Sequence, residues 1–157
     1  MNNMFYNCSS LKKIEFLSID TSQVKSMVGM FAGCKELEFI DLTKFNSSNV
    51  YDMSFMFNNC NKLKEIKGIK KIKTNNDINM STMFKCCNEL EYLDLSYFDT
   101  TNVTDMTYMF NKCNKLKYLN ILNFIVNDIT KNMFSFAQKE TCEFITENND
   151  LKDKYYS

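Results

Sequence analysis

Cysteines are the residues whose type and spacing could do chemistry in this chain. Five of the seven lie three residues after a Met-Phe dipeptide, at Cys8, Cys34, Cys60, Cys87 and Cys113, which we call the Cys ladder. Such a ladder has three interpretations: buried thiols acting as small hydrophobes, disulfides between neighbours, or zinc ligands. Side chains in one column point in parallel, and the pair Cys86-Cys87 is adjacent rather than spaced as zinc ligands are. The spacing therefore favours buried, reduced thiols.

The composition removes most catalytic chemistry. The 157 residues include no His and no Trp, and the 19 basic residues are all Lys. Ser-His and Cys-His nucleophile pairs, imidazole metal sites and arginine fingers cannot be built from these residues. The 19 acidic residues balance the 19 basic ones, so no basic excess is available to neutralise phosphates. We expect no enzyme, no cofactor, no metal site and no nucleic-acid partner.

The ladder belongs to an internal repeat of about 26 residues. The repeat is marked by the dipeptides Met4-Phe5, Met30-Phe31, Met56-Phe57, Met83-Phe84, Met109-Phe110 and Met133-Phe134. A leucine follows each ladder cysteine by three residues and opens a Leu-x-x-Leu-x-Leu pattern. A unit this short cannot bury its own apolar face, so the units must stack on one another.

Two periodicities alternate within each unit. The Leu-x-Leu stretch has the period of two that is typical of a strand with one buried face. Val50, Met53, Met56 and Phe57 step by three and four, which predicts a short helix. Asn49 with Asp52, like Asn102 with Asp105, has the spacing of a capping box at the start of such a helix.

These patterns predict an α/β fold: a right-handed leucine-rich-repeat solenoid of about five turns, each with one parallel strand and one short helix. The predicted domain spans residues 1–146, followed by a charged C-terminal tail at 147–157. Its repeats lie near 4–29, 30–55, 56–82, 83–108 and 109–132, and a degenerate cap at 133–146 ends in an edge strand. The third repeat is irregular, because Gly68 replaces an apolar residue and predicts a bulge at Lys67-Gly68.

Two stretches carry a family resemblance. LEYLDLSYFDTTNVTDMTYMF and LEFIDLTKFNSSNVYDMSFMF resemble the BspA-like leucine-rich repeats, the 26-residue class of mycoplasma lipoproteins and protist surface proteins. The resemblance covers residues 4 to about 134. It implies a non-enzymatic ligand-binding or adhesion module at the cell surface or secreted. The alternative is a structural spacer, or a fragment of a longer repeat array, with no ligand of its own.

The ends of the chain allow three expectations. Neither a signal peptide nor a lipid-acceptor or anchor segment is recognisable, and no apolar run is long enough to insert into a membrane. The sequence thus leaves the compartment open. The first strand, about Lys12 to Leu17, should present an open edge, which we expect to be covered by an N-terminal extension or by self-association with a second chain.

The outward positions of the strands are the candidate ligand-binding site. Period-two alternation places Lys13, Phe39, Glu65, Tyr92 and Tyr118 in one outward column and Glu15, Asp41, Lys67, Asp94 and Asn120 in the next. Exposed aromatic residues on a rigid face are typical of binding hot spots, although they also stabilise sheets as cross-strand pairs. The predicted ligand-binding residues are Phe39, Tyr92 and Tyr118 with Asp41 and Asp94. The expected partner is a protein or a glycan with basic or hydroxyl-rich groups.

Overall fold

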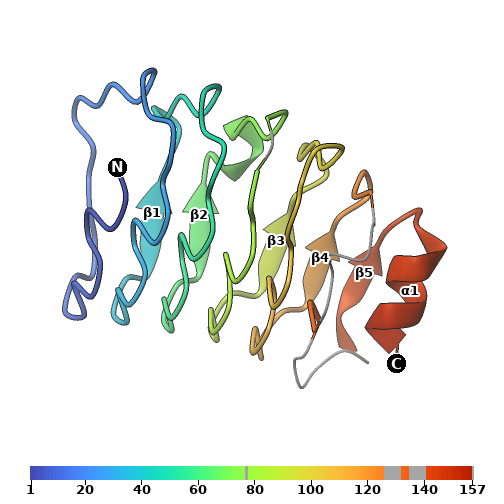
Figure 1. Ribbon diagram of the computed structural model, residues 1–157. Coiled ribbons are helices and arrows are strands. Elements are labelled where there is room, and N and C mark those ends of the chain that lie inside the picture. The colour runs from blue at the N-terminus through green and yellow to red at the C-terminus, as the bar shows by residue number, and fades with distance from the viewer. Residues whose placement is uncertain (77, 126–131, 135–140, 157) are drawn as a thin grey trace.

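Successive repeats of the chain stack side by side in chain order (Figure 1). The computed structural model describes residues 1–76, 78–125, 132–134 and 141–156. Its strands are β1 (Phe39–Asp41), β2 (Glu65–Lys67), β3 (Tyr92–Asp94), β4 (Tyr118–Asn120) and β5 (Glu143–Ile145). Within these residues the helices are a 3-10 helix, η1 (Ile69–Lys71), and an α-helix, α1 (Asn149–Tyr156).

The strands form two small parallel sheets, β1-β2 and β3-β4-β5. In β1 and β2, Ile40 pairs with Ile66, and in β3 and β4, Leu93 pairs with Leu119. Each pair joins equivalent positions of neighbouring repeats, so the prediction of parallel strands stacked one repeat apart is confirmed. Isolated parallel bridges join equivalent positions on the opposite side of the stack, Ser26 to Asp52, Asp52 to Asn79 and Asn79 to Asp105.

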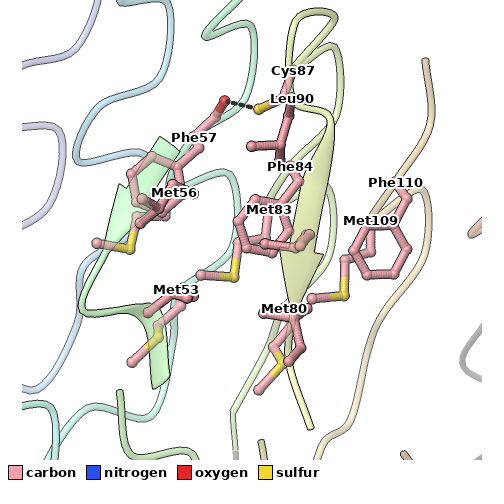
Figure 2. Packing of buried hydrophobic residues seen from close by; sticks show 14 of the residues in the cluster. Met53, Met56, Phe57, Met80, Met83, Phe84, Cys87, Leu90, Met109 and Phe110 are labelled. Atoms are coloured by element: carbon pink, nitrogen blue, oxygen red, sulfur yellow. Dashed lines mark hydrogen bonds between the residues drawn. The ribbon is translucent and has the colours of Figure 1, made fainter. Parts of the chain in front are cut away.

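The core is a set of columns that run through the stack. The Phe rings of the Met-Phe dipeptides stack with near-parallel planes, with centroids 5.8 Å apart for Phe57 and Phe84 and 6.0 Å apart for Phe84 and Phe110. Figure 2 shows these rings beside the methionines that precede them. Because successive repeats add apolar residues to the same columns, the buried apolar cluster runs from Met27 to Tyr155. This placement agrees with the interpretation of the Met and Phe positions as core.

The Met-Phe segments, which we call the turn side, are not helices, so the prediction of one short helix per turn is wrong. In the third repeat the N–H groups alternate between two kinds of partner. Phe57 donates to the Met83 carbonyl of the next repeat at 2.9 Å, whereas Met56 donates to Met53 in its own repeat at 3.2 Å. An α-helix would need its interior N–H groups for its own carbonyls. Stacking therefore replaces helical hydrogen bonds with a ladder between repeats.

Left-handed backbone conformations recur within these segments. Phe55 and Asn59 have φ angles of 60° and 59°, and the equivalent residues in the other repeats are also positive: Asn3 and Asn7, Gly29 and Gly33, Thr82 and Cys86, and Tyr108 and Lys112. Two such residues per segment break the right-handed helix into consecutive turns. The predicted capping-box residues serve other purposes: the carboxylate of Asp52 accepts from the N–H of Ser54 at 2.9 Å, and the Asn49 amide donates to Ser22.

A column of buried hydroxyls links the repeats where each strand segment turns back. Thr74 Oγ1 donates to the carbonyl of Asp99 at 2.9 Å and accepts from the N–H of Asp99 at 2.8 Å. Thr21 makes the same pair of bonds to Asn46, and Ser47 makes it to Lys73. These hydroxyls are satisfied in both directions, so they can be buried at no net loss of hydrogen bonds.

Replacing Thr74 by valine should destabilise the fold by about 2 kcal/mol or more. The change keeps the shape of the side chain but leaves both backbone groups of Asp99 without their partner. Urea unfolding measures the loss. Thr104→Val, at an exposed threonine, is the matched control and should change stability by less than about 0.5 kcal/mol. Equal effects in the two variants would mean that the hydroxyl column contributes nothing.

The third repeat interrupts the sheet. Gly68 has a φ angle of +82° and leads directly into η1, so the extra residue forms a 3-10 turn where a bulge was predicted. The turn restores the phase, since Ile69 and Ile72 are both buried. Strands β2 and β3 are not paired with each other, whereas the turn side continues through the same repeats. The irregularity expected at Lys67-Gly68 therefore opens one side of the stack only.

The two ends of the stack differ. At the C-terminal end β5 pairs with β4, within the segment where an edge strand was expected, and α1 lies beside β5 (Figure 1). The segment predicted as a charged tail, 147–157, contains this helix, in which Leu151 and Tyr155 are four residues apart and share a buried face. Tyr155 stacks on Phe144 with centroids 4.0 Å apart. Residues 135–140 of the predicted cap lie outside the described residues.

On its strand side the first repeat has a single bridge, from Lys13 to Phe39. Its apolar side chains are less covered than their equivalents in the interior. Phe5, Leu11, Ile14 and Phe16 are half-buried, and Leu17 is 83% exposed. The segment Lys12 to Leu17 thus lies at an outer face of the stack, and its cover by an N-terminal extension or by a second chain stays a prediction.

Candidate functional site

The outward column of the strands lies where the alternation predicted. Phe39 is in register with Glu65 on β1 and β2, and Tyr92 is in register with Tyr118 on β3 and β4. The two tyrosine rings stack at 4.3 Å with an interplanar angle of 8°. Tyr92 is 57% exposed, while Phe39 and Tyr118 are half-buried. The structure brings Tyr92 and Tyr118 together, and the unpaired edges of β2 and β3 separate them from Phe39.

The two predicted acidic residues are neutralised by lysines. The Asp41 carboxylate forms an ion pair with Lys67 at 2.8 Å and accepts hydrogen bonds from the N–H and hydroxyl of Thr43. Hydrogen bonds from Lys67 and Thr43 hold the pKa of Asp41 well below its usual range. The sequence suggested a free acidic column beside the aromatic residues. The counter-ion of Asp41, however, is Lys67 of that same column.

Asp94 differs from Asp41 because it is buried. Its carboxylate forms an ion pair with Lys70 of η1 at 2.5 Å and accepts from the hydroxyl and N–H of Ser96. Burial alone would raise the pKa of Asp94, but the hydrogen bonds from Lys70 and Ser96 outweigh it and lower the pKa. Asp94 therefore serves to hold η1 against β3 and presents little of its charge to a ligand.

A hollow of about 420 Å³ opens between β2 and β3. Its lining combines one exposed aromatic ring, several charged side chains and an apolar floor, from Glu65, Gly68, Ile69, Lys71, Tyr92 and Leu93. It lies where strand pairing would otherwise close the surface. The volume falls within the range of small-molecule sites. Of the five predicted ligand residues, Tyr92 and Asp94 line this hollow.

Comparison with known proteins gives one family. The model of a family described as "Mycoplasma protein of unknown function, DUF285" matches residues 1–67 and, in an overlapping second match, residues 39–150. The chain belongs to this family. A search of the curated proteins found no match, and neither did a search of the solved structures. Overlapping matches to one DUF285 model are what a chain with an internal repeat is expected to give.

The Cys ladder of this DUF285 chain is buried except at its first member. Cys34, Cys60, Cys87 and Cys113 are fully buried, whereas Cys8 is exposed. The prediction is therefore confirmed for four thiols and wrong for Cys8, which lies in the half-covered first repeat. All seven cysteines are free. In residues 1–76, 78–125, 132–134 and 141–156 there is no cluster of three or more residues able to hold a metal ion.

Each buried thiol of the ladder also has a hydrogen-bond partner in the preceding repeat. Cys87 Sγ donates to the carbonyl of Phe57 at 3.3 Å, the contact drawn as a dashed line in Figure 2. Cys34, Cys60 and Cys113 make equivalent bonds to Phe5, Phe31 and Phe84. Burial raises the pKa of all four thiols, to about 11 at Cys34, so they stay protonated at neutral pH. A protonated buried thiol is a poor nucleophile.

We expect the four buried thiols to resist alkylation in the folded protein. With iodoacetamide under native conditions Cys8 should react first, and the four ladder thiols should react only after denaturation. Mass spectrometry of peptides labelled before and after denaturation measures the order. The exposed Cys8 serves as the internal control. Rapid native labelling of Cys60 or Cys87, or two or more disulfides in the purified protein, would contradict the packing of the ladder.

Alkaline pH should weaken the fold through the same thiols. The Cys34 thiol loses its proton near pH 9.0 when unfolded but near pH 11 when folded. Between these values the unfolded state binds fewer protons, so the free energy of unfolding falls as the pH rises. The contribution of Cys34 is complete below pH 9.0 and lost by about pH 11. Urea unfolding of wild type and Cys34→Ser should show their difference shrinking by about 1 to 3 kcal/mol over this window.

Two residues of the hollow were missed by sequence reasoning. Lys70 and Lys71 belong to η1, which fills the irregular part of the third repeat. The available signal was the repeat length itself, since the Met-Phe interval is 27 residues here and 26 in the repeats on either side. An insertion in one repeat of a stack marks a departure from the regular surface. Among the described residues of this DUF285 chain, no helix has the length and apolar character to cross a membrane.

Proposed function

We propose that this chain is a BspA-like leucine-rich-repeat solenoid that binds a protein or glycan ligand through its strand side and has no enzymatic activity. Three features support the architecture: strands recur at equivalent positions from the second repeat onward, paired strands join equivalent residues one repeat apart, and the Phe column is continuous. A cell-surface or adhesion role follows from the resemblance and belongs to the same proposal.

The observation that carries the binding function is the stacked pair Tyr92 and Tyr118. Tyr92 is 57% exposed and is held 4.3 Å from the ring of Tyr118 on a hydrogen-bonded sheet. Its side chain therefore retains little conformational freedom, and binding a ligand costs little further entropy. It also borders a hollow rather than a flat surface. An aromatic ring beside a partly enclosed space is a typical binding hot spot.

The partner chemistry follows from the charges. Asp41 and Asp94 are paired with Lys67 and Lys70, so the strand side offers hydrogen-bonding groups without a strong net field. Nucleic acid needs a basic surface, which a chain of zero formal net charge does not supply on average. A hydroxyl-rich or peptide-like surface fits better than a highly charged one.

The test is a ligand screen with the variant Phe39→Ser, Tyr92→Ser, Tyr118→Ser. The wild type is screened on immobilised glycans and on purified extracellular proteins, and each hit is repeated with the triple variant. We expect the variant to stay folded, because these side chains are exposed or half-buried, and to lose at least about 90% of binding. A folded triple variant that binds every hit as well as the wild type would move the ligand face elsewhere.

The second candidate function is a structural spacer. It is favoured by the unbroken ladder of bonds between repeats on the turn side, which makes a stiff stack whether or not a ligand binds. The same screen separates the two functions. A wild-type protein that binds neither the glycans nor the proteins supports the spacer.

A further inference from the structure

The hollow between β2 and β3 is a consequence of the third repeat. Gly68 brings its backbone close to the preceding repeat, where a Cβ would lie 2.7 Å from the Thr43 nitrogen. The chain then turns through η1, and Lys70 reaches across to Asp94 of β3. The turn thus props β2 and β3 apart and ties η1 to β3 at the same time. The hollow is therefore a fixed part of the fold, because it is formed by the turn at Gly68 and by the ion pair between Lys70 and Asp94.

The hollow is closed at both ends of the strand segment. Before the strands, the N–H of Glu89 donates to the carbonyl of Asn61 at 3.2 Å, and after them Thr74 bonds to Asp99 at 2.9 and 2.8 Å. The third and fourth repeats are therefore in hydrogen-bond contact on either side of the gap. An extended peptide cannot add itself as a strand between β2 and β3 without breaking these bonds. The space suits a compact group that enters from the outer surface.

The chemistry of the lining is an aromatic platform with a balanced polar rim. One face of the Tyr92 ring rests on Tyr118, which does not line the hollow, so the opposite face is the one available to a ligand. Lys64 and Lys70 are engaged by Glu38 and Asp94. Among the described residues Glu65 and Lys71 have no ion-pair partner, which leaves one acceptor and one donor on the rim.

We infer that the hollow binds the ring of a neutral sugar, with the apolar C–H face of the ring on Tyr92 and its hydroxyls on Glu65 and Lys71. A sugar ring needs this combination, because one of its faces is apolar while its edge carries groups that both donate and accept hydrogen bonds. Ile69 and Leu93 supply a dry floor beneath it. The inference rests on the proposed binding function and narrows its ligand from protein or glycan to glycan.

Charge argues against ionic ligands at this position. Within the described part of the chain, the unpaired charges of the lining are one of each sign, the ammonium group of Lys71 and the carboxylate of Glu65, because Lys64 and Lys70 are paired. With the paired charges cancelled, the remaining carboxylate and ammonium balance each other, so an uncharged ligand fits best.

Saturation-transfer difference NMR tests the assignment with the whole chain. The samples are the methyl glycosides of glucose, galactose, mannose and N-acetylglucosamine, followed by an array of their oligosaccharides. We expect transfer to at least one of them, strongest at the ring C–H protons of one face. Tyr92→Ala should weaken binding by about tenfold, and Glu65→Gln and Lys71→Gln each by several-fold. Tyr51→Ala, an exposed tyrosine outside the strands, and Lys112→Gln, an exposed lysine, are the matched controls and should bind as the wild type does.

The outcomes separate this inference from the proposed function. Absence of transfer to every sugar overturns the sugar assignment; if a protein found in the screen above still depends on Phe39, Tyr92 and Tyr118, the strand side remains the binding face. Sugar binding that Tyr118→Ala removes and Tyr92→Ala spares overturns the hollow as its location. Sugar binding that none of the hollow variants changes places the ligand elsewhere and overturns the inference as well. Unfolding midpoints equal to the wild type confirm that each variant is folded.

Discussion

Replacing Phe84 by alanine is expected to lower the free energy of unfolding by about 3 to 5 kcal/mol. Phe84 is completely buried and stacks on Phe57 at 5.8 Å and on Phe110 at 6.0 Å, in the middle of the column that joins the repeats. Its removal leaves a cavity that neither neighbour can fill, because each ring is held by its own repeat. Urea unfolding followed by circular dichroism measures the loss.

Phe5→Ala is the matched control for Phe84. Phe5 is the first ring of the same column, stacks only on Phe31 within it, at 5.5 Å, and is half-buried. Its loss should cost clearly less than that of Phe84, since less surface is buried and the end of the stack can relax. Equal losses at Phe5 and Phe84 would contradict a column whose interior is packed and whose first member is half-covered.

Replacing Gly68 by alanine should cost about 3 kcal/mol or more, unusually much for a position that is only half-buried. The φ angle of +82° is unfavourable for any residue with a Cβ, and that Cβ would lie 2.7 Å from the Thr43 nitrogen and 2.9 Å from its Cα. The backbone of Thr43 is held close to this point, because the N–H of the preceding Leu42 donates to the carbonyl of Lys67 at 2.8 Å. Urea unfolding compares the variant with wild type and with Lys71→Ala, an exposed neighbour expected to change little.

Gly68→Asn separates conformational strain from the close approach. Asparagine tolerates a left-handed backbone better than alanine does, but it brings the same Cβ toward Thr43. We therefore expect Gly68→Asn to be nearly as unstable as Gly68→Ala. A variant with asparagine that is as stable as the wild type would show that β2 does not pass so close to β1 at this point, and the origin assigned to the hollow would be wrong.

The strand half of each repeat could be predicted because its pattern is local. Alternation at Leu93 and Leu95 gives the buried face, and the outward neighbours Tyr92 and Asp94 follow from the same register. The repeat then places equivalent residues side by side without further information. This is why the Tyr92–Tyr118 contact was foreseen from spacing alone.

The turn side was mispredicted because its pattern is ambiguous. Met53, Met56 and Phe57 point inward in consecutive turns as they would from one face of a helix, so apolar spacing does not distinguish the two. The hydrogen-bond partners of the backbone N–H groups distinguish a helix from consecutive turns. The N–H of Phe57 donates to the carbonyl of Met83 in the next repeat. A partner 26 residues away cannot be recognised from a window of one helical turn.

The charges of the candidate site were mispredicted for a similar reason. Lys70 belongs to the third repeat and Asp94 to the fourth, at positions that are not equivalent in the repeat pattern. They meet only because η1 folds toward β3. The sequence placed Asp94 in an exposed acidic column, whereas the 3-10 turn buries it under a lysine of the preceding repeat. The hollow arises from the same turn, so neither feature is visible before the insertion in the third repeat is placed in space.

The most direct test of the strand side as the binding face is a comparison of two triple variants. One carries Phe39→Ser, Tyr92→Ser and Tyr118→Ser; the other carries Tyr51→Ser, Phe55→Ser and Tyr108→Ser, three exposed aromatic residues outside the strands. Both lose three rings, so they match in the chemistry removed, and binding to the glycan array is measured beside the wild type. The proposed function predicts loss of binding in the first variant and wild-type binding in the second. Binding kept by the first and lost by the second would place the ligand on the turn side and contradict the account.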